Sequence, residues 1–451
     1  MKKKTLRYTS LFIITALFLM APRCGILGGQ PPGEEPPQID TKTPITLEYW
    51  RLWDDSDVLD EFIEEYTKDH KNITIEVKKV ELKSGETIYD YQSRLIKLIA
   101  DGAGPDMFMI HNDWLPYMQQ QIVPIPSGMY STKDYRDTFP NVVQEDFIKD
   151  NQIYAIPYYT DNLMLFYNTD IFSEKKIKQP PRTLQELVNI VPLLTEYDSR
   201  GRIVRSAVPL GVADGIPRSA EILTALMMQY GAVMTSEDKT KATFNLPAPG
   251  TNPPVFAAQE ALVYYTQFAN PNSPIYTYTD AQDTSGIRQL PSDIQAFGEG
   301  KAAIMIGYSY QIPNIQKFYP NLKFATAPLP QRQPQNPVTI ANYWGETVSR
   351  TSLNPNEAWD FIKFMSSRSN QSKYFSITKH VPSNKDLLAK YEDKRYYGPV
   401  AEQVSYSKSW YRHNSPEVED IFAQMINNVL KNKISPEIAV DSAVRDINEI
   451  T

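Results

Sequence analysis

The 451-residue chain has little cysteine and little histidine. Cys24 is its single cysteine, so no internal disulfide can form and the fold must rely on its hydrophobic core. The four histidines, His70, His111, His380 and His413, are scattered, without the His-x-x-x-His or cysteine pairing that zinc sites use. We therefore expect no metal centre.

Features that bind phosphate or nucleic acid are missing too. The stretch GAGPD at residues 102–106 lacks the Lys and the Ser or Thr of a phosphate-binding loop, so we expect no cofactor. The formal net charge is −7 at pH 7, and an acidic body argues against nucleic acid as a partner.

Long apolar runs are absent except at the N-terminus. Three lysines and an arginine within residues 2–7 precede the run LFIITALFLM at 11–20, which has the length of a signal-peptide core and is too short to span a membrane comfortably. Residues 1–23 are therefore predicted to be a signal peptide. Its removal takes five positive and no negative charges from the net charge of −7, which leaves −12.

Cys24 directly follows this segment, in the position that is lipidated in bacterial lipoproteins, although Arg23 stands where a small residue is usual. Residues 24–43 are rich in Pro and Gly and cannot build a packed core, so they are predicted to be a tether. Extended, such a tether would reach roughly 60 Å. We expect a lipid-anchored protein on the outer face of the cell membrane; an uncleaved signal segment, or a free protein in the periplasm, are the alternatives.

What is present from residue 45 onward is an alternation of strands and helices. The first five segments predict a parallel sheet with crossover helices, in which ligands bind beyond the carboxyl ends of the strands. The predicted strands are 45–50, 72–80, 107–110, 208–212, 302–306, 324–329 and 338–348. The predicted helices are 58–66, 88–98, 184–194, 220–230, 255–268, one that is capped by Ser292 and stops near Gly298, 357–375, 421–430 and 437–450.

The order of several short motifs resembles one known family. These motifs are IADGAGPDMFMI at 99–110, IYAIPYYTDNLMLFYNTDIF at 153–172, PRTLQELVNI at 181–190, AFGEGKAAIMIG at 296–307 and NPNEAWDFIKFM at 354–365. They resemble the extracellular solute-binding proteins of ABC importers, family 1, which includes the maltose- and oligosaccharide-binding proteins. Leu184 departs from the family pattern, which has Trp there.

The resemblance implies an α/β, two-lobed periplasmic-binding-protein fold (type II-like). Each lobe would be a mainly parallel sheet flanked by helices, and the chain would cross the hinge more than once. We expect residues 44–157 with 303–342 to form one lobe and residues 158–302 with 343–451 to form the other. The implied protein is a monomer and not an enzyme. It captures a solute in the cleft and delivers it to membrane permeases.

The residues at the predicted strand ends suggest that this solute is a sugar. A pyranose has an apolar C–H face that flat aromatic rings can cover, and a rim of hydroxyls that carboxylates and amides can bind. The predicted ligand-binding residues are Trp50, Trp53, Asp54, Asp55, Asn112, Asp113, Trp114, Tyr158, Tyr159, Asp161, Tyr308, Tyr310, Trp344, Glu346 and Trp410.

Some of these residues also have a purely structural interpretation. Trp50 ends an alternating strand and could belong to the core, and Asp54 and Asp55 could simply cap the following helix. Trp359 lies at helical spacing from other apolar residues and is expected in the core.

Two other functions stay open at this point. A binding protein for a polyol phosphate, peptide or polyamine would have the same fold, but a phosphate would require clustered Arg or Lys, and only Arg51 and Arg288 qualify. A secreted glycoside hydrolase would need two carboxylates across a cleft, and Asp113 with Glu346 is the pair available.

Overall fold

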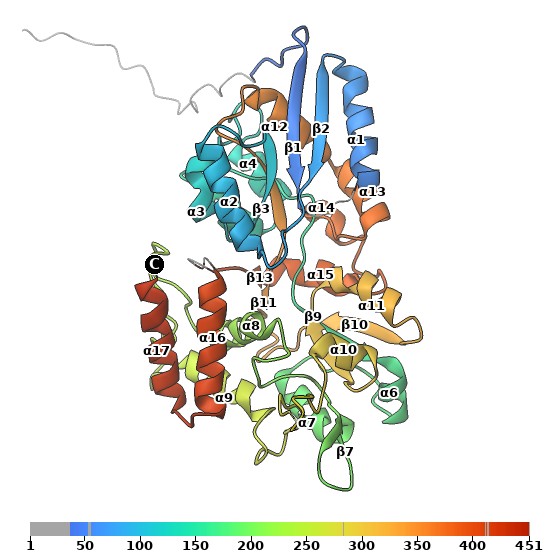
Figure 1. The fold of residues 1–451 in the computed structure, drawn as a ribbon, viewed down its shortest axis with the longest axis vertical. Helices are drawn as coiled ribbons and strands as arrows, with labels where there is room; N and C mark the ends of the chain where they lie inside the picture. Colours follow the sequence, from blue (N-terminus) through green and yellow to red (C-terminus); the bar gives the residue numbers. More distant parts are fainter. Residues whose placement is uncertain (1–36, 53–55, 283, 411, 413–414, 451) are drawn as a thin grey trace, which may run out of the picture.

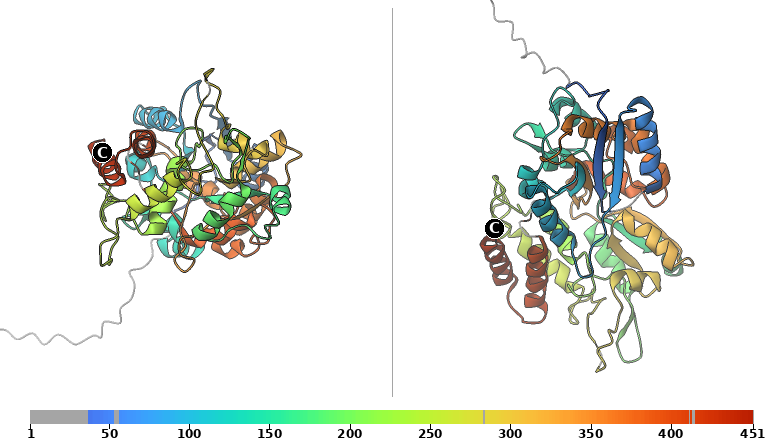
Figure 2. Two further views of the ribbon diagram at one scale, coloured as in Figure 1. Left: turned by 90° about the horizontal axis from the view of Figure 1, so that it is seen from below. Right: turned by 45° about the horizontal axis from the view of Figure 1, so that its top comes forward.

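The computed structural model describes residues 37–52, 56–282, 284–410, 412 and 415–450. They form two lobes stacked along the long axis of the molecule (Figure 1). Each lobe has its own sheet and its own hydrophobic core, and the view turned by 45° shows the same division (Figure 2, right). The expected two-lobed α/β fold is confirmed.

Lobe 1, the upper half in Figure 1, is built on a four-stranded sheet in the order β12-β3-β1-β2. The β1 strand runs parallel to β2 and β3, and β12 is antiparallel to β3. All five residues of β3 are buried, as expected for a central strand covered on both faces. The strands of lobe 1 are β1 (Ile45–Arg51), β2 (Ile73–Lys79), β3 (Met107–His111), β12 (Trp344–Val348) and the hairpin β4 (Ile148–Lys149) with β5 (Gln152–Ile153).

Helices flank this sheet. In α2, Thr87 and Asp90 form a reciprocal capping box at the first turn, and Tyr91, Leu95 and Ile99 are buried along one face. The helices of lobe 1 are α1 (Ser56–Asp69), α2 (Ile88–Ala100), α3 (Leu115–Met118), η1 (Gln119–Gln121), α4 (Thr132–Thr138), α5 (Asn141–Phe147), α12 (Pro355–Met365) and α13 (Arg368–Thr378).

Lobe 2 has a three-stranded sheet in the order β10-β6-β9, with β6 antiparallel to both neighbours. Alternate residues of β6 serve two cores: Leu165 packs into one, while Met164 and Phe166 pack into the other. The strands of lobe 2 are β6 (Met164–Asn168), β9 (Ile304–Gly307), β10 (Phe324–Pro328), β7 (Glu196–Tyr197), β8 (Ile203–Arg205), β11 (Thr339–Ile340) and β13 (Ser407–Lys408).

The mainly parallel sheet expected for each lobe therefore holds in lobe 1 only. In lobe 2, β6 is antiparallel to both β9 and β10. The helices of lobe 2 are α6 (Thr169–Glu174), α7 (Leu184–Leu194), α8 (Ser219–Tyr230), α9 (Ala257–Gln267), α10 (Asp293–Gly298), η2 (Ser309–Gln311), α11 (Ile312–Phe318), α14 (Lys385–Leu388), α15 (Gly398–Gln403), η3 (Val404–Tyr406), α16 (Ser415–Leu430) and α17 (Pro436–Glu449).

Three chain segments pass between the lobes side by side. Tyr159 bridges Pro382 and Asn162 bridges Ala341, both in antiparallel fashion. The backbone N–H of Thr160 donates to the Val381 carbonyl at 2.8 Å. The hinge is thus a small ribbon of three strands, and the cavity described below lies beside it.

The predicted division of the chain between the lobes is wrong in its second half. Residues 303–342 were expected in lobe 1, but β9 and β10 pair with β6 of lobe 2. Residues 343–451 were expected in lobe 2, but β12 pairs with β3 of lobe 1, and the chain returns to lobe 2 only after α13. An apolar sequence predicts that a strand is buried, but it does not predict which sheet the strand joins.

Three predicted elements also differ. Residues 208–212 form no strand, since pairing with the β9 edge stops at Ala207. The predicted strand 338–348 is divided into β11 and β12 because the chain changes lobe between them. The predicted helix 357–375 is divided in two: α12 ends at Met365, and Ser367 caps α13 by accepting a hydrogen bond from the Asn370 N–H.

The end of the predicted tether belongs to the folded body. Ile39 packs against the core of lobe 1, and the backbone N–H of Asp40 donates to Glu357 at 2.9 Å. Residues 1–36, which include the predicted signal peptide and Cys24, lie outside the described residues. Among the described residues, no helix combines the length and apolarity that a membrane crossing requires.

Candidate ligand-binding site between the lobes

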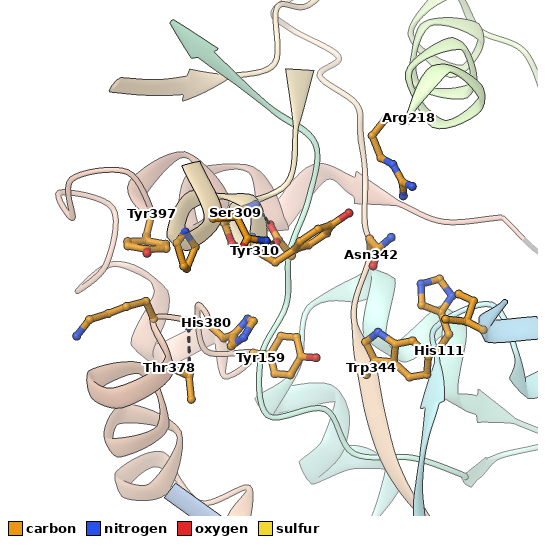
Figure 3. Close-up of a pocket in the computed structure, with 15 residues that line it drawn as sticks. His111, Tyr159, Arg218, Ser309, Tyr310, Asn342, Trp344, Thr378, His380 and Tyr397 are labelled. Carbon is orange, nitrogen blue, oxygen red and sulfur yellow. Dashed lines mark hydrogen bonds between the residues drawn. The ribbon is translucent and has the colours of Figure 1, made fainter. Parts of the chain in front are cut away.

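A cavity of about 530 Å³ lies between the two lobes, next to the hinge. Figure 3 shows the side chains arranged around it. Residues from both lobes and from the hinge contribute to its wall: Ile88, His111, Tyr159, Asp161, Arg218, Ser309, Tyr310, Pro313, Asn314, Asn342, Trp344, Thr378, Lys379, His380 and Tyr397.

Trp344 forms the lobe 1 wall of the cavity. It is the first residue of β12 and pairs with His111, the last residue of β3, so both side chains stand at the edge of the sheet that faces lobe 2. The Trp344 ring meets His111 edge to face, with ring centroids 5.2 Å apart. Trp114 supports Trp344 from inside the lobe at 5.0 Å, and is itself 1% exposed.

Tyr159 forms part of the wall at the hinge. Its ring stacks on Tyr374 of α13, with centroids 5.9 Å apart and an interplanar angle of 7°. His380, from another hinge segment, lies 4.4 Å from the Tyr159 ring. Two crossing segments and a lobe 1 helix therefore fix the orientation of this tyrosine.

Tyr310 is the main aromatic ring on the lobe 2 side. It lies in η2, directly after β9, and stacks on the buried Tyr308 with centroids 5.7 Å apart. Tyr310 is 41% exposed, which makes it the most accessible large ring of the cavity wall. The Tyr308 hydroxyl in turn lies 3.4 Å from Glu221.

Asp161 holds the turn that carries Tyr310. Its carboxylate accepts hydrogen bonds from the Ser309 hydroxyl at 2.8 Å and from the backbone N–H groups of Asn162, Ser309 and Tyr310. Burial raises the pKa of Asp161 to about 6, against the lowering effect of these hydrogen bonds. Asp161 thus borders the cavity, but its oxygens already serve the protein backbone.

Polar groups complete the rim. Arg218, the residue before α8, ion-pairs with Glu221 at 3.1 Å. Asn342 lies where the second hinge segment passes the cavity, and Lys379 follows α13. Guanidinium, amide and imidazole groups are thus available to bind hydroxyl groups of a ligand.

Beside the cavity the lobes touch directly across a narrow crevice. Asp113 of lobe 1 lies 3.2 Å from Arg412 of lobe 2 and 2.5 Å from Nδ1 of His111. Asp146 of lobe 1 accepts hydrogen bonds from the hydroxyls of Ser409 and Tyr343, and burial raises its pKa to about 6. Asn112, Tyr308 and Trp410 also line this crevice, whose free volume is only about 20 Å³.

Comparison with known proteins gives this two-lobed molecule a family. Residues 61–396 match the family model described as bacterial extracellular solute-binding protein. The chain belongs to the bacterial extracellular solute-binding protein family. This confirms the resemblance inferred from the motif order, and it makes the protein a solute-binding protein and not an enzyme.

Individual relatives of this solute-binding protein are distant. The galactooligosaccharide-binding protein of Bacillus subtilis (strain 168) is 23% identical over 409 residues, which cover 87% of each chain. An uncharacterized ABC transporter extracellular-binding protein of Pyrococcus horikoshii is 21% identical over 390 residues, covering 84% of this chain and 81% of that one. A cyclo/maltodextrin-binding protein solved with maltotetraose is 19% identical with a TM-score of 0.72, covering 91% and 98% of the two chains, and shares the fold.

The structure of the solute-binding protein divides the predicted site residues into four groups. Four of them, Tyr159, Asp161, Tyr310 and Trp344, line the cavity. Four more, Asn112, Asp113, Tyr308 and Trp410, line the crevice where the lobes touch. Trp53, Asp54 and Asp55 lie outside the described residues. Trp50, Trp114, Tyr158 and Glu346 lie inside lobe 1.

The last group corrects the prediction. Trp50 donates to Glu48 at 2.6 Å and carries the Lys78 ammonium over its ring. Glu346 forms a buried ion pair with Arg51 at 3.3 Å. Trp50 and Glu346 each have a partner within lobe 1, so an aromatic or acidic residue near a strand end did not by itself indicate a ligand.

Tyr158 and Trp114 fail for a related reason. Tyr158 is 2% exposed and packs edge to face on Tyr374, because successive residues of an extended segment point to opposite sides and Tyr159 takes the cavity side. Trp114 lies one layer behind Trp344. Trp359, expected in the core, is indeed fully buried in lobe 1.

Eleven cavity residues were not predicted as ligand-binding, among them His111, Arg218, Asn342, Lys379, His380 and Tyr397. His111 ends β3, so the strand-end rule that selected its neighbours could have found it. The others reach the cavity from a helix start, two hinge segments and a loop, which carry no comparable pattern in one sequence.

Proposed function

We propose that this protein captures a sugar or oligosaccharide in the cavity between its lobes and delivers it to the permease subunits of an ABC importer. The observation that carries the proposal is the placement of flat rings from both halves of the molecule on one cavity. Trp344 comes from lobe 1, Tyr159 from the hinge and Tyr310 from lobe 2.

The chemistry of the wall suits a pyranose. Ring faces such as those of Trp344 and Tyr310 offer large apolar area with few rotatable bonds to immobilise. Imidazole, amide and guanidinium groups on the rim can exchange hydrogen bonds with sugar hydroxyls. Because both lobes contribute, a bound sugar would interact differently with open and closed arrangements, as a ligand must if it drives hinge closure.

The charges of the wall favour a neutral ligand over a phosphate-bearing one. Of the two arginines considered for a phosphate, Arg51 is buried in its pair with Glu346 inside lobe 1, and Arg288 is not among the residues that line the cavity. Arg218 does border the cavity, but Glu221 already offsets its charge at 3.1 Å. A phosphate would call for clustered cations that are free to pair with it.

The names of the relatives point in the same direction. They include a galactooligosaccharide-binding protein and a maltodextrin-binding protein of Bacillus subtilis. Related folds have been solved with maltotetraose, mannobiose and tagatose. We infer the ligand class from this agreement together with the aromatic cavity.

The predicted N-terminal segments complete the proposal. A signal peptide at residues 1–23 would export the protein, a lipid on Cys24 would anchor it to the membrane, and the body would act as a monomer near its permease. Mass spectrometry of the N-terminal peptide from membranes should find a lipid-modified Cys24. An unmodified peptide beginning upstream of Cys24 would contradict the anchor.

Thermal-shift and calorimetric titration test the ligand class. The panel contains maltotriose, maltotetraose, mannobiose and D-tagatose, with amino acids, spermidine and glycerol 3-phosphate as non-sugar solutes. At a hundredfold excess over Kd, a true ligand stabilises the folded state by about 2.7 kcal/mol and raises Tm accordingly. Stabilisation by a non-sugar alone would contradict the carbohydrate assignment.

A further inference from the structure

We propose that Asp113 is a positioning residue that sets which ring nitrogen of His111 faces the ligand, and that Arg412 of the opposite lobe holds Asp113 in place. The proposal rests on the function proposed above, because it specifies how that cavity accepts a hydrogen bond from one sugar hydroxyl. Neither Asp113 nor Arg412 lines the cavity itself.

His111 links the cavity to this pair. Its ring borders the cavity beside Trp344, while its Nδ1 lies 2.5 Å from Oδ1 of Asp113. An ionised carboxylate only accepts hydrogen bonds, so Nδ1 must carry the proton. Within the described part of the chain, Nε2 of His111 has no hydrogen-bond partner.

This geometry assigns a role to each nitrogen. In the neutral ring with the proton on Nδ1, Nε2 is an acceptor. A ligand O–H group can therefore donate to it. Asp161, the carboxylate on the same cavity wall, already accepts from Ser309, Tyr310 and Asn162, so His111 offers a further acceptor on this wall.

Arg412 reaches the second oxygen of Asp113 from lobe 2. Its Nη2 lies 3.2 Å from Oδ2 of Asp113, and its Nη1 lies 3.4 Å from Glu419. The side chains of Asp113 and Arg412 are 3% and 11% exposed, so replacing either one removes an ionic contact from a buried charge. Glu221 and Arg218 lie next in the same charged cluster.

The pair spans the two lobes. Asp113 follows β3 of lobe 1, and Arg412 lies between β13 and α16 of lobe 2. Any movement that separates the lobes at this crevice breaks the contact. The orientation of Asp113, and with it the presentation of Nε2, is therefore completed only when the lobes meet, which couples recognition of one hydroxyl to closure.

The first test is nitrogen NMR of the full-length protein labelled with 15N-histidine. The probe is whichever of maltotriose, maltotetraose, mannobiose and D-tagatose binds most tightly, and a His111→Gln variant identifies the His111 signals. We expect a protonated Nδ1 and an unprotonated Nε2 in the complex, and a mixture of both tautomers in Asp113→Asn. A protonated Nε2 in the wild-type complex would overturn the proposal.

The second test is calorimetric affinity for the same saccharide. Loss of a charge-assisted contact should weaken binding roughly ten- to a hundredfold in Asp113→Asn and Arg412→Gln. Arg412→Lys keeps the positive charge and should recover most of the loss. Arg202→Gln is the matched control, because Arg202 pairs with Asp198 on the surface of lobe 2 and is 60% exposed. Affinities of Asp113→Asn and Arg412→Gln within twofold of the wild type would overturn the proposal.

The two proposals can fail separately. The wild-type protein could bind a saccharide while Asp113→Asn changes neither the tautomer of His111 nor the affinity. The positioning role is then wrong and the carbohydrate function stands. If no saccharide binds, the carbohydrate function is wrong. The tautomer of His111 in the ligand-free protein then decides on Asp113: Nδ1–H supports its positioning role and Nε2–H refutes it.

Discussion

The two walls of the cavity hold their aromatic rings by different means. On the lobe 1 side, Trp344 begins a strand and rests on Trp114, with the sheet and the Arg51–Glu346 ion pair below. On the lobe 2 side, Tyr310 sits in a short 3₁₀ turn that Asp161 ties down through hydrogen bonds. The first wall depends on packing in depth, and the second on a single carboxylate.

This difference suggests a division of labour. The lobe 1 ring is 7% exposed and is pre-positioned by neighbours on several sides. The lobe 2 ring is 41% exposed and follows the geometry of its turn. We therefore expect substitutions beneath the lobe 1 ring to lower mainly the free energy of unfolding. Substitutions in the lobe 2 turn should also change how that free energy depends on pH.

The largest effect is expected for Glu346→Ala. It leaves Arg51, which is 1% exposed, without its buried counter-charge, and breaking such a pair costs about 3–5 kcal/mol. Urea denaturation should show this loss in the free energy of unfolding. Glu64→Ala, which removes the exposed pair with Lys68, should change it by less than about 0.5 kcal/mol. Equal losses in the free energy of unfolding of the two variants would show that the buried pair beneath Trp344 stabilises lobe 1 no more than an exposed pair does.

Asp161→Asn comes next. The amide cannot accept all the hydrogen bonds that the carboxylate accepts, so we expect a loss of about 1–3 kcal/mol in the free energy of unfolding at pH 7.5. Burial raises the pKa of Asp161 to about 6 in the folded protein, against 3.8 in the unfolded chain. The folded state therefore binds more protons between these values, and this group's contribution to stability falls as pH rises through that window.

The pH dependence separates Asp161 from a generic destabilising change. The wild type should gain about 2 kcal/mol over Asp161→Asn when the pH is lowered from 7.5 to 4.5, measured by urea denaturation at both values. If the difference in the free energy of unfolding between the wild type and Asp161→Asn does not change with pH, the burial of Asp161 does not govern its ionisation.

Trp344→Ala should have the larger effect of the two ring deletions on saccharide binding. Loss of a well-packed aromatic surface is expected to weaken affinity by about 2 kcal/mol, close to thirtyfold, by calorimetry. Trp50→Phe is the control, because Trp50 contacts Glu48 and Lys78 inside lobe 1, and it should bind as the wild type does. Similar losses in both would place the ligand elsewhere.

Tyr310→Ala should weaken the same saccharide by about 1 kcal/mol, since an exposed ring loses less contact area when it is removed. Stability should hardly change, because Tyr308 beneath it stays buried. A loss larger than that of Trp344→Ala would reverse the order of the two walls.

Much of the fold could be predicted from periodicity and capping signals. Thr183 with Glu186 caps α7 as a capping box, and Gly231 ends α8 in a left-handed conformation, so both helices have local chemical boundaries. The sharing of strands between lobes could not be predicted this way. The apolar β9 would fit either sheet, and its pairing with β6 depends on contacts between residues far apart in the chain.

The cavity wall could be predicted in part from where strands end. Trp344 and Tyr310 were selected because they lie next to the ends of predicted strands, and both line the cavity. Glu346 was misassigned because its partner Arg51 is remote in sequence and close only in the fold. Tyr397 and Lys379 were missed because loops, and not strand ends, bring them to the cavity.

The proposed function requires that one saccharide contacts both lobes and holds them together. Pulsed electron–electron double resonance measures the distance between two spin labels, one on each lobe. The labels are attached at Lys68→Cys in lobe 1 and Lys323→Cys in lobe 2, in a Cys24→Ser background, and both lysines are exposed. On adding the saccharide that calorimetry identifies, we expect a shorter and narrower distance distribution. An unchanged distribution despite saturated binding would contradict it.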